Sequence, residues 1–351
     1  KYFVLILLFA CSWNHKDFEK TLSKDVSAAD PQVEVDESLR DKFEVQEKKE
    51  EIKVEEKKEL AQPNKKEIKI KTENKKVPLP AVAKKTKTPA PIIVKPAPKK
   101  LPEDYPAELI EVEKKASAVW KQYKPNHSLE DKIFLNINYM GMTVGKIMFT
   151  NNGKKIINDK EVWHFHARFK SAPFYSRIYE LDDTVDTYVT TDEFLSTRYS
   201  LVQRESKQDV DDLQLHDREQ LKTFWFYKRV TKDKEKEKKE SNYIPYHSLD
   251  PFSVVFFYQG LPLKNGDVYE IPLINKTKIL IFKTTVIGRE TIETSRGPKK
   301  AIKVHALTKY TGDHLKSGEL TFWFSDDDKR TLLKGQAKIK IGSVTAEIVN
   351  K

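Results

Sequence analysis

The segment DPFSVVFFY, residues 250–258, decides the fold. An aspartate followed by proline is typical of a helix start, because the carboxylate can accept a hydrogen bond from a free backbone N–H and proline has no N–H to leave unpaired. The residues from Phe252 to Tyr258 are apolar nearly all round, so the predicted helix has to be covered by other parts of the chain. We expect the concave face of a sheet to cover it.

Strand patterns flank this segment on both sides. In residues 133–139, apolar side chains alternate with Asn136 and Asn138, as in a strand with one buried face. Turn signals at 151–153 and 342–343 predict tight hairpins. Strands are predicted at residues 133–139, 146–150, 162–169, 184–190, 195–203, 213–219, 223–230, 268–274, 278–287, 290–295, 300–307, 318–324, 332–341 and 344–349. The predicted fold class is therefore mainly β: a curved antiparallel sheet or open half-barrel with one helix in its concavity.

Glycine, proline and aromatic residues divide the chain. All eleven glycines lie between Gly141 and Gly342, whereas ten of the seventeen prolines lie between Pro31 and Pro106. Residues 44–104 contain no aromatic side chain, and such a tract buries too little apolar surface to offset its chain entropy. The expected organisation is a disordered Lys/Glu and then Lys/Pro linker over 12–104, a helix over 105–124 and a β-rich domain over 125–351. The sequence leaves open whether that helix packs on the domain, and the charged residues 232–239 are expected to form a disordered loop.

Residues 1–11 have the pattern of a bacterial lipoprotein signal. The apolar run Tyr2–Ala10 would span about 14 Å as a helix, about half of a bilayer core, so it is too short to cross a membrane and fits a secretory signal. Leu8-Phe9-Ala10-Cys11 resembles the lipobox, in which the cysteine is acylated, although Phe9 is larger than usual. Cys11 is the only cysteine. The alternatives are an ordinary signal peptide with an incidental cysteine, or a buried apolar start.

The charge distribution and the predicted signal segment together predict partners in the bacterial cell envelope. Acylation of Cys11 would anchor the chain in a membrane, at the periplasmic face of the outer membrane or at the cell surface. The formal net charge of +11 is uneven: residues 30–60 carry a net charge of −5 and residues 61–100 a net charge of +10. The lysine-rich block can attract peptidoglycan, other anionic polymers or anionic lipids, or it can simply be a solvated tether. Nucleic acid is excluded as a partner, because the block has no interleaved aromatic residues and the chain has no recognition motif.

Few residues have the types and spacing expected of a catalytic or metal-binding site. His164 and His166 share a strand face and could ligate a metal ion if His216 and Asp217 came close, but solvent-facing polar residues are the preferred interpretation. The acidic run at 326–328 lacks the spacing of a calcium loop and fits a surface turn. The carboxylate pair at residues 182–183 has no companion feature that would mark a catalytic dyad, and no hydrolase, phosphate-loop or dinucleotide motif occurs. The sequence therefore predicts no enzyme, no catalytic residue, no metal and no cofactor.

Large aromatic residues are the remaining candidates for a binding site. Core packing accounts for most of them, but a curved sheet holding one helix can leave a slot beside that helix. The slot could accept an acyl chain or an apolar segment of a partner protein. The candidate lining residues are Trp163, Phe165, Trp225, Phe252, Phe256 and Phe257.

A family resemblance adds to this interpretation. The carrying motifs, in order, are YMGMTVG at 139–145, DP at 250–251, NG at 265–266, Gly288 with 294–297, TFWFSDD at 321–327 and the final glycine-containing hairpin. This series, over about residues 130–349, resembles the bacterial envelope family called domain of unknown function 3108 (DUF3108). The resemblance implies a secreted or lipid-anchored β-rich protein without established activity. It also implies a likeness, at the level of the fold alone, to the LolA/LolB half-barrels, in which a curved sheet holds a helix.

Two functions follow as hypotheses. In the first, the chain is a non-enzymatic envelope lipoprotein that binds a lipid-like ligand or an envelope partner in its curved β domain. In the second, it is a structural or scaffolding lipoprotein whose basic linker contacts anionic wall or membrane polymers. An open apolar pocket of several hundred Å³ beside the helix would favour the first hypothesis, and a filled concavity would favour the second.

Overall fold

The computed structural model describes residues 29–48, 101–127, 132–310, 318–339 and 341–349. These residues belong to one folded unit. The predicted signal segment 1–11, its Cys11 and most of the predicted linker lie outside the described residues. Of the helices in the described ranges, none has both the length and the apolar character that a membrane crossing requires.

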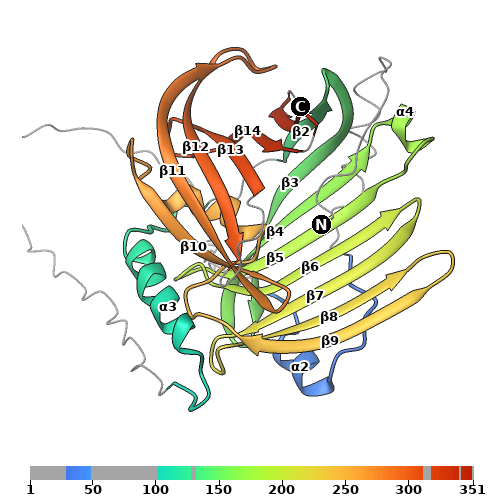
Figure 1. Cartoon of the computed structure of the whole chain (residues 1–351), viewed down its shortest axis with the longest axis vertical. Helices are drawn as coiled ribbons and strands as arrows, with labels where there is room; N and C mark the ends of the chain where they lie inside the picture. Colours follow the sequence, from blue (N-terminus) through green and yellow to red (C-terminus); the bar gives the residue numbers. More distant parts are fainter. Residues whose placement is uncertain (1–28, 49–100, 128–131, 311–317, 340, 350–351) are drawn as a thin grey trace, which may run out of the picture. The chain divides into compact units, whose positions relative to one another are not determined.

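One antiparallel sheet of 15 strands dominates the described residues (Figure 1). Its strands are β1 (Gln46–Glu47), β2 (Ile133–Tyr139), β3 (Met142–Ile157), β4 (Lys160–Ser171), β5 (Asp182–Thr190), β6 (Ser196–Glu205), β7 (Gln208–Asp217), β8 (Lys222–Val230), β9 (Glu235–Tyr243), β10 (Val268–Asn275), β11 (Lys278–Ile292), β12 (Lys299–Tyr310), β13 (Gly318–Ser325), β14 (Leu332–Lys338) and β15 (Ser343–Ile348). The helices are α2 (Glu37–Lys42), α3 (Ala107–Trp120), α4 (Pro173–Ser176) and α5 (Ser253–Phe257), followed by the 3₁₀ turn η1 (Tyr258–Gly260).

The strand order shows how the sheet is assembled. Strands β2 to β9 pair in sequence, and the chain then crosses to the opposite edge and returns from β10 to β15. The last strand pairs with the first large strand, with Val344 opposite Tyr139. Strands β9 and β10 are left as the two edges, so the sheet is open and does not close into a barrel. The predicted fold class, a mainly β, open antiparallel sheet, is confirmed.

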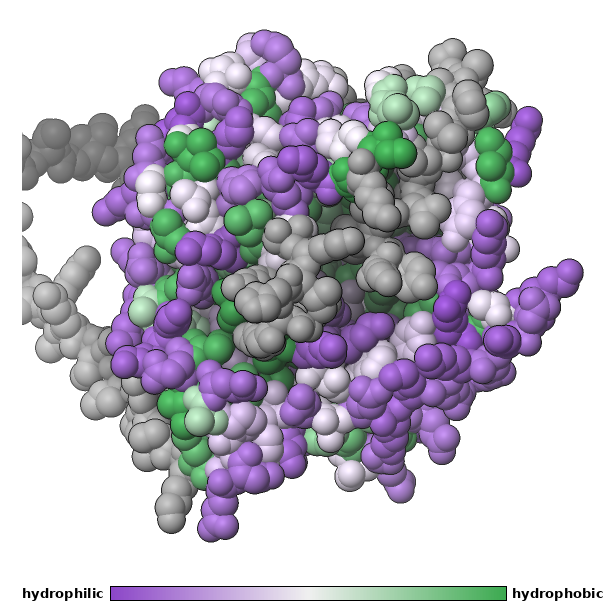
Figure 2. Space-filling model, in the orientation of Figure 1, coloured by the Kyte–Doolittle hydropathy of each residue, from purple (hydrophilic) through white to green (hydrophobic). Residues whose placement is uncertain are grey.

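Two sequence predictions about local structure are wrong. The turn predicted at 151–153 is a bulge inside β3, and the hairpin turn lies at Asn158 and Asp159, whose φ angles of 48° and 58° suit a tight two-residue turn. Residues 232–239, expected as a disordered loop, instead lead into β9, which pairs with β8 along its whole length. The alternating Lys and Glu residues of β9 keep this edge hydrophilic, as Figure 2 shows at its lower right.

The crossover between the two edges carries the aromatic helix. Helix α5 is shorter than predicted, because it begins at Ser253 and Pro251 precedes it. Asp250 nevertheless caps it: Oδ1 accepts hydrogen bonds from the backbone N–H groups of Phe252 and Ser253, both at 2.8 Å. Phe257 is fully buried in the main hydrophobic core, among residues from both halves of the sheet. The sheltered aromatic segment expected from the sequence is therefore present.

Arg218, at the end of β7, holds the chain just before α5. Its buried guanidinium donates hydrogen bonds to the carbonyl oxygens of Ser196, Pro245, Tyr246 and Ser248, and to the Ser248 hydroxyl. Burial lowers the pKa of Arg218 to about 10, so the group remains charged at neutral pH. Five backbone and side-chain oxygens thus share one buried positive charge, which fixes the path of the crossover.

Helix α3 packs on the folded unit. Its buried residues include Leu109, which contacts Ile244 and Ile274, and Trp120, which lies 4.5 Å from Phe257 between ring centroids. The indole N–H of Trp120 donates to the carbonyl oxygen of Glu193 at 2.8 Å. This answers the question that the sequence left open about residues 105–124.

Residues 29–48 differ from the expected disordered linker. Helix α2 and the short strand β1 lie against the sheet, where β1 pairs with β3 and Phe43 is buried beside Val162 and Tyr188. Lys42 donates to Asp217 at 2.8 Å. The prediction of disorder over 12–104 is therefore wrong for residues 29–48, and residues 49–100 lie outside the described part of the chain.

Candidate functional site

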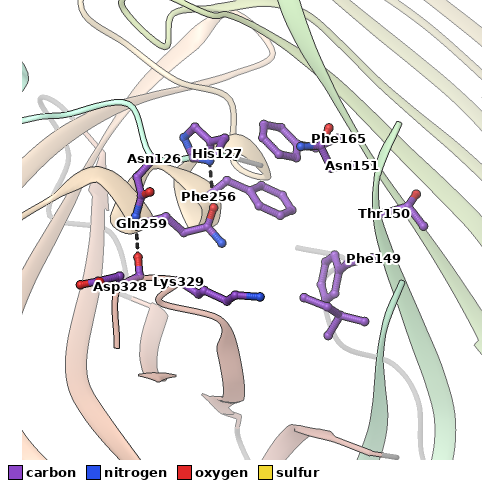
Figure 3. A pocket seen from close by; sticks show the side chains of 11 residues that line it. Asn126, His127, Phe149, Thr150, Asn151, Phe165, Phe256, Gln259, Asp328 and Lys329 are labelled. Atoms are coloured by element: carbon purple, nitrogen blue, oxygen red, sulfur yellow. Dashed lines mark hydrogen bonds between the residues drawn. The ribbon is translucent and has the colours of Figure 1, made fainter. Parts of the chain in front are cut away.

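A hollow of about 110 Å³ lies beside α5 (Figure 3). Strands β3 and β4 form one wall with Phe149 and Phe165, and Phe256 of α5 forms another. These three rings face the hollow because each belongs to the apolar face of its own element. The hollow therefore has an apolar wall from three separate segments of the chain.

The aromatic rings of this wall are in direct contact. The rings of Phe165 and Phe256 stack with centroids 4.1 Å apart and an interplanar angle of 9°. Phe149 meets Phe256 edge-on at 6.2 Å and stacks on Phe252 at 5.8 Å. Such contacts add to area burial and fix the ring positions, so the wall is preformed.

The opposite end of the hollow is polar. His127 hydrogen-bonds through Nδ1 to Gln259 at 2.9 Å and through Nε2 to the Tyr123 hydroxyl at 2.7 Å. Because Gln259 presents its oxygen, Nδ1 carries the proton and Nε2 accepts from Tyr123. The ring also stacks on Phe194 at 4.7 Å. Burial lowers the pKa of His127 to about 4, so the imidazole is neutral at physiological pH.

Exposed residues border the mouth of the hollow. Asp328 and Lys329 follow β13 and are exposed, and Asn126 donates to the Asp328 carbonyl oxygen at 2.5 Å. Figure 3 shows the Lys329 side chain extending across the hollow towards Phe149. The site combines an apolar wall with hydrogen-bonding groups at one end, which suits an apolar group attached to a polar backbone.

The six aromatic residues predicted as a groove do not form one lining. Phe165, Phe252 and Phe257 belong to the main core, and the partly buried Phe256 and Trp163 pack against it. Trp225 lies elsewhere: it contacts Tyr227 at 5.4 Å, and the Lys276 ammonium lies 4.8 Å from its ring centroid. Of the six, Phe165 and Phe256 line the hollow.

The space on another side of α5 is filled. Between α5 and β11–β13, among Val255, Tyr258 and Phe282, no space remains for a water-sized molecule. Sequence reasoning missed the polar residues of the hollow. His127 and Gln259 are hydrogen-bonded although 132 residues separate them, and neither occurs in a recognisable motif.

The acidic candidates have structural roles. Asp327 Oδ1 accepts hydrogen bonds from the Ser325 hydroxyl and from the backbone N–H groups of Lys329 and Arg330. The acidic run at 326–328 is therefore organised as a turn. Asp182 accepts from Arg168 at 2.7 Å and from Lys170 at 2.8 Å, as in a surface ion pair between neighbouring strands.

The histidines were placed wrongly by the sequence analysis. His164 and His166 are buried rather than solvent-facing. His216 lies on the other face of the sheet, because its neighbour Leu215 packs in the cluster around Val162, and its Nδ1 meets the Thr223 hydroxyl at 3.1 Å.

Comparison with protein families assigns most of the sheet. The family described as "Protein of unknown function (DUF3108)" matches residues 135–349. The chain belongs to the DUF3108 family. A comparison of this DUF3108 protein with curated proteins gives no match.

Solved structures resemble parts of the DUF3108 chain. A β-barrel-like protein of domain of unknown function DUF1849 from Brucella abortus is 12% identical, with a TM-score of 0.41 over 62% of this chain and 95% of that one. A putative lipoprotein from Parabacteroides distasonis is 9% identical, with a TM-score of 0.28 over 64% of this chain and 95% of that one.

Proposed function

We propose that this DUF3108 protein is a non-enzymatic lipoprotein of the cell envelope that binds an apolar side chain of an envelope partner protein in the hollow beside α5. The observation that carries the proposal is the preformed hollow. Phe149, Phe165 and Phe256 offer it an apolar wall, and His127 and Gln259 close one end with polar atoms. A protein segment fits this chemistry, since it presents an apolar side chain on a hydrogen-bonding backbone.

The size of the hollow supports a small apolar group as its occupant. Pockets that enclose a whole drug-sized ligand measure about 300–1,000 Å³, whereas this hollow measures about 110 Å³. This volume supports a single aromatic or branched aliphatic group as the occupant rather than a complete acyl chain. Of the two ligands that the first sequence hypothesis left open, a lipid-like ligand and an envelope partner, we therefore propose the envelope partner.

The proposed location in the cell envelope rests on the N-terminal residues. The apolar run before Cys11 and the lipobox-like Leu8–Cys11 support export and acylation. We expect a Cys11→Ser chain to leave the membrane fraction, as followed by fractionation and immunoblotting. Retention of this variant in the membrane would mean that acylation does not anchor the protein.

Photo-crosslinking in living cells tests the binding proposal. A photoreactive residue replaces Lys329, an exposed residue that lines the hollow, and in the control chain replaces Val230, an exposed residue at the end of β8. We expect the Lys329 position alone to give a protein adduct of defined mass, and a Phe256→Trp substitution, which fills the hollow, to abolish it. Lipid adducts, or the same adducts at both positions, would contradict the proposal.

A scaffolding function is the second candidate, and the filled space between α5 and β11–β13 favours it. Here the lysine-rich residues 61–100 would bind anionic wall polymers through their net charge of +10. The test is co-sedimentation of the purified full chain with peptidoglycan at increasing salt. We expect binding to fall steeply with ionic strength if the lysines act, and an unchanged bound fraction would contradict this function.

A further inference from the structure

Three side chains of types that can ligate a metal ion meet on the sheet face opposite the hollow. His164 and His166 are two residues apart in β4, so they share a face, and Phe165 between them points to the main core. Asp186 of β5 stands directly opposite His166 in the strand register. Sheet pairing alone therefore brings two imidazoles and a carboxylate together.

The three groups converge on one point. His164 Nε2 lies 2.6 Å and His166 Nδ1 lies 2.8 Å from the same oxygen, Asp186 Oδ1. One potential ligand atom from each residue lies within 4.8 Å of the other two. The exposed fractions are 4% for His164, 0% for His166 and 1% for Asp186. Converging ligand atoms held by two paired strands are what a small cation needs.

The remaining polar atoms of this cluster have no partner. Asp186 Oδ2, His164 Nδ1 and His166 Nε2 are buried without a hydrogen bond. Buried polar atoms are almost always paired, and leaving them unpaired costs free energy. Because His164 Nδ1 and His166 Nε2 have no hydrogen-bond partner, each of these nitrogens can carry the proton of its ring. The other nitrogen of each ring, which faces Asp186, then has a lone pair for an ion. Asp186 Oδ2 is likewise open for coordination.

We propose that His164, His166 and Asp186 form a binding site for one divalent transition-metal ion, with zinc as the fitting species. Imidazole nitrogen and carboxylate oxygen are ligands that zinc takes at about 2.0–2.2 Å, and imidazole suits this class of ions better than calcium or magnesium. A doubly charged ion would also compensate the buried carboxylate. Three protein ligands leave a further coordination position.

The position of the site indicates a structural role. The Tyr188 ring stacks on His164 with centroids 4.4 Å apart, and Tyr188 packs in the apolar cluster that contains Phe43. The metal would therefore join β4 to β5 beside the surface on which residues 29–48 pack. Binding of the ion to the folded chain alone would stabilise that arrangement.

Metal titration of the full chain tests the proposal. The protein, purified without a histidine tag, is stripped with a chelator, and zinc binding is measured by competition with a chromophoric chelator and by elemental analysis. We expect one tightly bound zinc ion per chain, and at least tenfold weaker binding in Asp186→Asn and His166→Gln. His216→Gln removes another buried histidine outside the cluster and is expected to bind zinc as the unaltered chain does.

Cobalt distinguishes the site from an unrelated zinc contact. Cobalt(II) should give the visible absorption of an ion bound through nitrogen and oxygen in the unaltered chain and in His216→Gln, and lose it in Asp186→Asn. Circular dichroism of each variant confirms folding. No retained zinc in the folded chain, or equal affinity in Asp186→Asn, would overturn the proposal and identify the cluster as a hydrogen-bonded triad without an ion.

Discussion

Ser196 donates its hydroxyl hydrogen to Asp250 Oδ2 at 2.6 Å, and both residues are completely buried. Thr187 donates to the same oxygen at 2.5 Å, while Oδ1 caps α5. One carboxylate thus begins the aromatic helix and fastens it to β5 and β6. The helix that walls the hollow is positioned by this link.

Asp250→Ala should destabilise the folded unit by about 3–5 kcal/mol, because the cap is lost and two buried hydroxyls lose their acceptor. Asp250→Asn keeps one oxygen and should cost less. Urea unfolding followed by tryptophan fluorescence measures both, with the exposed Asp233→Ala as the control, for which we expect a change within about 0.5 kcal/mol. A loss below about 1 kcal/mol for Asp250→Ala would show that the link does not carry the helix.

Phe43→Ala tests the packing of residues 29–48 on the sheet. Phe43 is buried beside Val162 and Tyr188, and truncation of a buried phenylalanine costs about 3–5 kcal/mol when the cavity does not collapse. We expect the Phe43→Ala chain to unfold at a lower urea concentration and to be cleaved faster by protease within residues 29–48. The neighbouring exposed Glu44→Ala should behave like the unaltered chain, and equal cleavage rates for the two variants would contradict the packing.

Stability should fall in acid because of His127. Its folded-state pKa of about 4 lies below the ordinary value of 6.5, so the unfolded chain binds a proton first as the pH falls. The loss begins near pH 6.5 and is complete near pH 4, and it amounts to roughly 3 kcal/mol at most. His127→Gln should flatten this part of the profile of unfolding free energy against pH. An unchanged slope between pH 6.5 and 4 would disagree with a buried neutral imidazole.

The contribution of Asp183 to the free energy of unfolding should depend on pH in the opposite direction. Burial, with a further contribution from Glu205, raises the pKa of Asp183 to about 7. The folded chain therefore holds a proton that the unfolded chain releases from about pH 4, and stability is lost as the pH rises towards 7. Asp183→Asn should match the unaltered chain near pH 4 and be more stable by about 1–3 kcal/mol at pH 8. Scanning calorimetry at the two pH values checks this, and an equal melting temperature at pH 8 would count against it.

Local sequence patterns predicted the strands well and the turns poorly. The alternation in residues 133–139 and 162–169 identified β2 and β4, because a half-buried strand imposes a period of two on its own residues. The turn predicted at 151–153 does not form, because these residues make a bulge in β3 and the strand continues to pair with β4 on both sides of it. Cross-strand pairing outweighed the local turn preference.

The sequence by itself determined the fold class, the aromatic segment behind Asp250 and the family, because these depend on residues that are neighbours along the chain. The tertiary structure decided which polar residues meet. His127 reaches Gln259 and Lys42 reaches Asp217 across 132 and 175 residues, and Asp186 faces His166 through strand pairing. Strand register and long-range packing set these contacts, and neither leaves a periodic signal in the sequence.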